Sequence, residues 1–339
     1  MTRAIGVCLV RRLGRVLKRE TDPKQSSARA KRARGAKASG RRKAGIRAVS
    51  ERDSAIANRL DALVSLLGDE SPTVWDGVQR EFRAFGKLGF STLEKAARSS
   101  SPRMRSRART LLGERDKDCS VRRLARYAVR EHVDLERAFF LLSRHHSPRL
   151  DPRPYQRALA AMAREVVKRG RSKPNELDRA LVLVEYLGNE LAIGGITGDF
   201  HHPDNIHIHR AIERRAGIPL TLCALYLFVA RRAGIKAAIL PLPGHVMLRL
   251  YGDGKSVIVD PYHHGQGRTH AQCKKYLEQN GLGFHPAWLQ PATDAVLFKR
   301  QLTNLMRSAK ERGLAGDAKA FRSLVRLFEP RMHKGFTLP

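Results

Sequence analysis

The chain has 339 residues, of which 65 are Lys or Arg and 32 are Asp or Glu, so its formal net charge at pH 7 is +33. This length allows two domains, or one domain with a helical appendage. No apolar run reaches transmembrane length, and the charge favours anionic partners, which would bind non-specifically and in a salt-sensitive way.

The first 50 residues form the most basic segment, with sixteen Lys or Arg and two acids. Residues 20–50 carry almost no large apolar side chain, so they cannot bury enough surface to order themselves. We predict a basic disordered tail over 1–50. Three interpretations stay open for it: non-specific binding to nucleic acid, a solvated charge run without a partner, and an organelle transit peptide.

Residues 54–115 show helical spacing interrupted by short breaks. The apolar positions of the first pair of helices are Leu60, Leu63, Val64, Leu67, Val74, Val78, Phe82 and Phe85. The stretches STLEKAARS and PRMRSRARTLLGER repeat the arrangement of helix, break and helix. This pattern predicts two HEAT-like helical hairpins that stack their apolar faces, although a TPR or a plain helical bundle fits the same pattern.

Helical spacing continues through residues 120–190, and a glycine-rich loop, AIGGITGDFHHPDN, follows it. The loop lacks the spacing of a phosphate cradle, so we predict no nucleotide site. Near the C-terminus, residues 294–330 are predicted to form a helical pair with Leu302, Leu305, Leu324 and Leu327 in its core.

The stretch 217–262 is predicted to form a helix and then a β-hairpin. Pro219 suits a first helical position, where its missing N–H costs nothing, and Gly234 ends the helix. The Gly-Asp-Gly turn between two apolar runs indicates a hairpin. If its loop is centred between Asp253 and Gly254, opposite residues sum to about 507 by strand counting.

This register brings a histidine and an aspartate together. Met247 then faces Asp260, and His245 is a diagonal neighbour on the same face. An aspartate that accepts from one imidazole nitrogen leaves the other nitrogen available as a base, as in Cys-His-Asp sites. The nearest thiol is Cys223, about 6 Å beyond Pro219 by helix rise, so it is a candidate nucleophile only.

Several motifs in order resemble the SirB-type transglutaminase-like family, a branch of the papain-like transglutaminase superfamily. They are DFHHPDNIHIHRAIERR, RRAGIPLTLCALYLFVARRAGI, PGHVMLRL and VIVDPY. The resemblance implies an α+β fold, with the α-helical HEAT-like N-terminal region followed by a helix-plus-antiparallel-sheet core over residues 120–290. It also implies that His245 and Asp260 match the catalytic His and Asp, and that Pro219 stands where the enzymes carry their nucleophilic Cys.

The leading hypothesis is therefore a degenerate transglutaminase-like protein, or pseudoenzyme, that binds or regulates a protein partner through its helical surface. One alternative is an active thiol hydrolase or acyltransferase that uses Cys223, His245 and Asp260. Another alternative is a basic protein associated with nucleic acid. We expect no cofactor and, because four scattered cysteines fit a reducing compartment, a cytoplasmic location.

Histidines gather around the same region, and the sequence raises the question of a zinc or nickel site. They are His201, His202, His207, His209, His263, His264 and His270. Residues two apart on a helix do not share a face, so a helix over 207–215 would separate His207 from His209. On that ground we predict no metal site.

Overall fold

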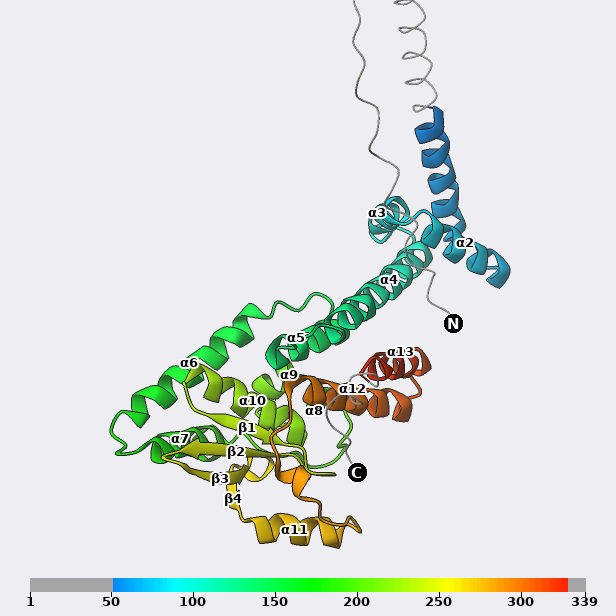
Figure 1. Ribbon diagram of the computed structural model, residues 1–339. Helices are drawn as coiled ribbons and strands as arrows, with labels where there is room; N and C mark the ends of the chain where they lie inside the picture. The colour runs from blue at the N-terminus through cyan, green and yellow to red at the C-terminus, as the bar shows by residue number, and fades with distance from the viewer. Residues whose placement is uncertain (1–50, 329–339) are drawn as a thin grey trace, which may run out of the picture. The chain divides into compact units, whose positions relative to one another are not determined.

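The computed structural model describes residues 51–328 (Figure 1). The tail predicted over 1–50 therefore lies outside the described residues, and so do the last two positions of the helical pair predicted over 294–330. The chain forms two compact units that divide between Ala108 and Arg109. The division falls within the range 54–115 that we assigned to helical hairpins.

The first unit is entirely helical over its described residues. A helix covers residues 51–66, and α2 (Pro72–Ala84), α3 (Lys87–Ala96) and the start of α4 (Pro102–Ala128) follow. Arg107 donates to the backbone carbonyls of Leu67 and Asp69, and its guanidinium lies 4.8 Å from the Trp75 ring centroid. These contacts fix the turn between the first two helices.

The second unit combines helices with one small sheet, which makes the fold α+β (Figure 1). After α4, its helices are α5 (Leu135–His146), α6 (Arg153–Gly170), α7 (Glu176–Val184), α8 (Pro203–Ile206), α9 (Ile208–Arg214), α10 (Pro219–Arg232), α11 (His270–Gln279), α12 (Asp294–Glu311) and α13 (Ala315–Arg326). A π-helical turn, η1 (Glu185–Glu190), continues α7, and two 3-10 turns are η2 (Pro261–His263) and η3 (Pro286–Leu289). None of the helices between residues 51 and 328 is long and apolar enough to cross a bilayer.

The sheet is an antiparallel meander in the order β1-β2-β3-β4. Its strands are β1 (Ala237–Leu240), β2 (Met247–Gly252), β3 (Lys255–Asp260) and β4 (Gln266–Arg268). The hairpin between β2 and β3 turns on Asp253 and Gly254, with φ values of 53° and 70°. Both central residues have positive φ, as a type I′ turn requires, and Leu248 pairs with Val259. The predicted register is confirmed.

Helix α10 is the central element of the second unit. It begins at Pro219 and is buried from Pro219 to Ala230, as expected of a helix that is apolar on all sides. It packs against β1 and β2 on one side and against α5, α6, α7 and α9 on others (Figure 1). The predicted helix, with proline at its first position, is therefore confirmed.

The two faces of the sheet have different partners because side chains alternate along each strand. Ile239, Leu248 and Val259 join the large core that contains α10. Leu240, Met247 and Ile258 join a smaller cluster with Cys273 of α11, which lies on the other side of the sheet (Figure 1). This second face is the one that leads to the site described below.

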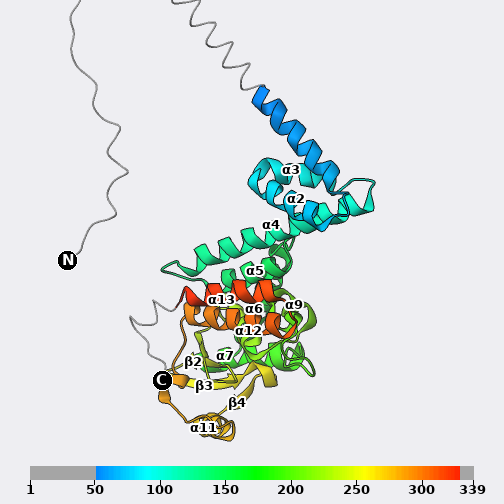
Figure 2. The same ribbon diagram turned by 90° about the vertical axis from the view of Figure 1, so that its right-hand side faces the viewer.

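Ion pairs lock the end of α10 to its neighbours. Arg231 binds both carboxylate oxygens of Asp294 at 2.9 and 2.7 Å, and Asp294 also accepts from the Leu135 amide at 3.0 Å. Asp294 opens α12, which lies side by side with α13 (Figure 2). One carboxylate thus joins the ends of α5, α10 and α12.

Candidate functional site

His245 and Asp260 form a buried pair at the ends of their segments. His245 precedes β2, and Asp260 is the last residue of β3. The imidazole Nε2 lies 2.8 Å from Asp260 Oδ1, so the predicted contact between the two side chains is confirmed. With Nε2 bound to the carboxylate, Nδ1 is the nitrogen left for chemistry.

Four groups converge on the Asp260 carboxylate, which is only 1% exposed. Oδ1 accepts from the Tyr262 amide at 3.1 Å besides contacting His245. Oδ2 lies 2.7 Å from His263 Nδ1 and 3.4 Å from the Arg268 guanidinium. Burial by itself raises the pKa of the carboxyl, but His245 and His263 outweigh it and lower the pKa of Asp260 to about 2.

Aromatic rings surround the imidazole of His245. Tyr262 meets it edge to face with the ring centroids 5.6 Å apart, and Tyr276 of α11 lies at 5.7 Å. The Tyr262 hydroxyl donates to the Ile196 carbonyl at 3.0 Å. The imidazole is therefore held in one orientation by packing as well as by its bond to Asp260.

Arg300 of α12 holds the loop that carries His245, and our sequence reasoning did not identify it. Its guanidinium donates to the carbonyls of Pro241 and Leu242 at 2.8 and 2.6 Å. Gly244 follows with a φ of +75°, a conformation that glycine adopts without strain. A positively charged side chain on a distant helix carries no local signal of such a role in the sequence.

The glycine-rich loop packs against the site. The Gly195 amide donates to the Tyr262 carbonyl at 2.7 Å. A Cβ at Gly195 would lie 2.6 Å from the Tyr262 ring, closer than real Cβ contacts come. Glycine is thus needed here for close approach, which explains a loop that fits no phosphate cradle.

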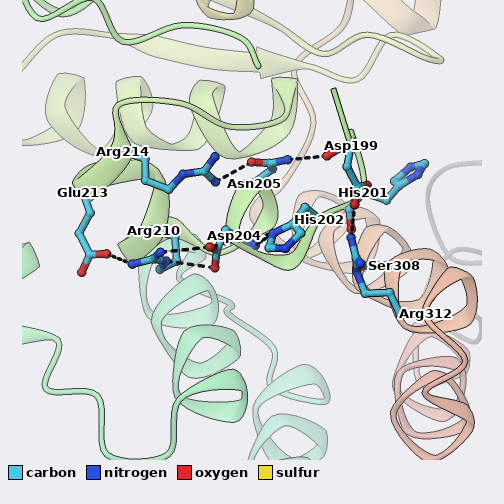
Figure 3. A network of polar contacts seen from close by, with 10 residues as sticks. All are labelled: Asp199, His201, His202, Asp204, Asn205, Arg210, Glu213, Arg214, Ser308 and Arg312. Atoms are coloured by element: carbon cyan, nitrogen blue, oxygen red, sulfur yellow. Dashed lines mark hydrogen bonds and ion pairs between the residues drawn. The ribbon is translucent and has the colours of Figure 1, made fainter. Parts of the chain in front are cut away.

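The segment 199–206 is held in place by a polar network (Figure 3). Asn205 donates to the Asp199 carbonyl at 2.7 Å and accepts from Arg214 at 2.7 Å. Ser308 of α12 donates to the His201 carbonyl at 2.5 Å, and Arg312 pairs with Asp199. The network anchors the neighbouring Phe200, whose ring lies 6.5 Å from that of Tyr262.

Cys223 is fully buried within α10. Its thiol donates a hydrogen bond to the Val246 carbonyl, with Sγ 3.4 Å from the oxygen. Burial, with the charge of Asp260 adding to it, raises the pKa of the thiol well above its usual value. The sulfur is therefore a neutral donor inside the core.

Neighbouring residues at the end of β3 pack toward different clusters because side chains alternate along a strand. Val259 packs into the core that contains Cys223. Asp260, one residue later, has the parity of Ile258, which packs toward α11. Tyr276 of α11 accordingly lies beside His245.

A second group of histidines lies elsewhere in the same unit. His146 stacks on His207 at 4.5 Å between ring centroids, and His209 lies 5.9 Å from His207. Our reason for separating His207 from His209 was wrong, because His207 is the N-cap of α9, with extended backbone, and not a helical residue. Nδ1 of each of these two buried rings has no hydrogen-bond partner among the described residues.

Burial sets the protonation of this group. It lowers the pKa of His207 well below the usual imidazole value, and the neighbouring His146 and His209 add to the effect. Burial also lowers the pKa of His209 to about 4, although Glu213 opposes it. These rings are therefore neutral at pH 7.

The remaining histidines of the sequence cluster have separate local roles. His201 pairs with Glu311 at 3.0 Å, and His202 caps α8 by accepting from the Asp204 amide. Of the seven, only His263 reaches the His-Asp pair within the described part of the chain. No single signal in the sequence distinguishes it from the others.

Residues 153–303 match the family model described as the transglutaminase-like superfamily, so the chain contains a transglutaminase-like domain. Two similar proteins, both called UPF0162 protein, come from two strains of Xylella fastidiosa. Each is 28% identical over 185 residues, which cover 52% of this chain and 64% of the relative. The match thus spans less than two thirds of the length of these relatives.

F-box only protein 21 of Mus musculus and of Homo sapiens is also similar to this chain. Each is 23% identical over 150 residues, which cover 42% of this chain and 23% of the longer protein. No solved structure matches the chain.

Proposed function

We propose that the protein is a degenerate, SirB-type transglutaminase-like protein that binds or regulates a protein partner and performs no thiol chemistry. The observation that carries this proposal is the state of Cys223, which is 0% exposed and whose thiol donates to a backbone carbonyl. A thiol nucleophile has to reach both solvent and its base as thiolate. Burial keeps Cys223 from solvent and raises the pKa of its thiol, which opposes thiolate formation.

The position of Pro219 supports the same proposal. It is the first residue of α10, where the helix dipole would lower a thiol pKa, and proline supplies no nucleophile there. His245 and Asp260 keep the arrangement of an orienting pair. In our proposal this pair no longer activates a thiol. The similar segment in F-box only protein 21 occupies 23% of that protein, which fits a module used inside larger proteins.

We place the binding surface on the helical first unit, with HEAT-like hairpins as its proposed architecture, and the protein in the cytoplasm. Cys119, Cys223 and Cys273 are free thiols, which fits a reducing compartment. The nucleic-acid alternative depends on the basic tail, which lies outside the described residues. Steeply salt-dependent binding that disappears on removal of residues 1–50 would favour it.

The test is covalent capture of the full chain by a glutamine-like chloroacetamide, read by peptide mass spectrometry. We expect the exposed Cys119 to be modified and Cys223 to stay unmodified, with no difference between the native protein and a His245→Ala variant. Modification of Cys223 that disappears in His245→Ala would overturn the proposal and establish the thiol-enzyme alternative. Cys119→Ser serves as the control for background labelling.

A further inference from the structure

We infer that His245, Asp260 and His263 form a binding site for a divalent transition-metal ion of the zinc type. The three residues come from the loop before β2, the end of β3 and η2. One ligand atom from each lies within 4.8 Å of the other two. The inference does not rest on the proposed function, because metal binding by these three side chains does not depend on the reactivity of Cys223.

The donor set fits such an ion. Two imidazole nitrogens and one carboxylate are typical ligands of zinc and of iron(II), whereas magnesium and calcium prefer oxygen ligands alone. The two rings contact different oxygens of the same carboxylate, at 2.8 Å for His245 and 2.7 Å for His263. An ion placed among them would therefore have both nitrogens and the carboxylate within reach.

Binding requires an adjustment of the side chains. With metal–ligand distances of about 2.0–2.2 Å, neighbouring ligand atoms of a tetrahedral ion lie about 3.4 Å apart. The nitrogens must thus move roughly 0.6 Å from the oxygens that they now contact, and ligand atoms that now lie up to 4.8 Å apart must move closer together. The His263 side chain is 52% exposed and can make this movement, and it gives an ion access from solvent.

Proton balance is satisfied without another reactant. Each ring now directs one nitrogen at the carboxylate, and this nitrogen gives up any proton that it carries when it binds the ion. Each ring then carries its proton on the other nitrogen, Nδ1 for His245 and Nε2 for His263. Three protein ligands leave a fourth position of the ion for water or for a carboxylate of a partner.

One charge opposes the ion and supplies a sharp test. The Arg268 guanidinium lies 3.4 Å from Asp260 Oδ2 and repels a cation at that position. Arg268→Gln should therefore tighten metal binding, and this variant leaves all three ligands intact. An ion bound elsewhere on the chain would not respond in this way.

The experiment is a titration of the full chain with zinc by chelator competition, repeated with cobalt(II) to read the ligand geometry from its absorption. We expect one zinc ion per chain at this site and at least about a tenfold loss of affinity in His263→Ala and Asp260→Asn. Arg268→Gln should raise the affinity, and the exposed His132→Ala should leave it unchanged.

Two results would overturn the inference. The first is a native protein that binds no zinc. The second is a folded His263→Ala variant with the affinity of the native protein, which would place the bound ion elsewhere. Because His263 is half exposed, its replacement tests the site even if Asp260→Asn fails to fold.

Discussion

Two groups of histidines in the same unit differ in one respect. His245 and His263 both contact the Asp260 carboxylate, which is buried and accepts four hydrogen-bond or ion-pair partners. Among the described residues, His207 and His209 pack on rings and make no hydrogen bond to a carboxylate, and Nδ1 of each ring has no partner. A buried charge thus organises the first group, whereas burial is the main cause that keeps the second neutral.

The largest effect should come from removal of the organising carboxylate. Asp260→Ala leaves His245, the Tyr262 amide and Arg268 without their acceptor. We expect the free energy of unfolding to fall by about 3–5 kcal/mol, as for other broken buried pairs. Urea denaturation measures this, with the exposed Asp118→Ala as a control that should change stability by less than about 0.5 kcal/mol. If Asp260→Ala and Asp118→Ala lowered the free energy of unfolding equally, the Asp260 carboxylate would not organise the first group of histidines.

The second group, His207 and His209, should make the free energy of unfolding decrease as the pH is lowered. His209 has a pKa of about 4 in the folded chain against an unfolded value near 6.5, so only the unfolded chain gains a proton between these values. Its contribution is complete above about pH 6.5 and decreases by about 3 kcal/mol as the pH falls to about 4. Denaturation curves at several pH values measure this change.

A matched variant isolates the histidine from other titrating groups. His209→Phe should remove this part of the pH dependence, and the exposed His132→Phe should keep it. If both variants lose the same stability between pH 6.5 and 4, titration of His209 does not account for the acid sensitivity.

Arg300 should have an intermediate effect, since it positions the first group from outside. Its two charged hydrogen bonds hold the carbonyls of Pro241 and Leu242. Arg300→Ala should cost about 2 kcal/mol and increase hydrogen exchange of the amides in residues 241–246. The exposed Arg307→Ala, on the same helix, should leave this exchange unchanged. If hydrogen exchange of residues 241–246 were unchanged in both variants, Arg300 would not hold this loop in place.

The smallest effect should come from His263. Its side chain is half exposed, so its contact with Asp260 should contribute about 1 kcal/mol or less. His263→Ala should therefore fold normally, which thermal denaturation checks. If His263→Ala lowered the stability as much as Asp260→Ala does, His263 would be needed to stabilise the buried carboxylate, which would contradict this prediction.

The sequence predicted the parts of the site that follow from strand periodicity. Counting through Asp253 and Gly254 was enough to pair His245 with Asp260, because antiparallel register is fixed once the turn is known. Strand counting could not place His263, because the position of this residue depends on the 3-10 turn η2 after β3. Nor could it place Arg300, whose contacts join α12 to a loop nearly 60 residues earlier.

The histidines near residue 207 show where local rules fail. The stretch around His207 and His209 has a helical pattern, yet the helix starts one residue later, at Ile208. That shift frees His207 to meet His146 from another helix. Helix boundaries depend on tertiary packing as well as on local sequence, so this contact was beyond sequence reasoning.

The central claim is that Cys223 is a buried, protonated thiol rather than a nucleophile. The most direct measurement is the pH dependence of Cys223 alkylation by iodoacetamide in the folded protein, resolved by peptide. We predict no native-state modification of Cys223 from pH 6 to about pH 9, while the exposed Cys119 reacts as an ordinary thiol. Rapid alkylation of Cys223 near neutral pH that depends on His245 would contradict the account.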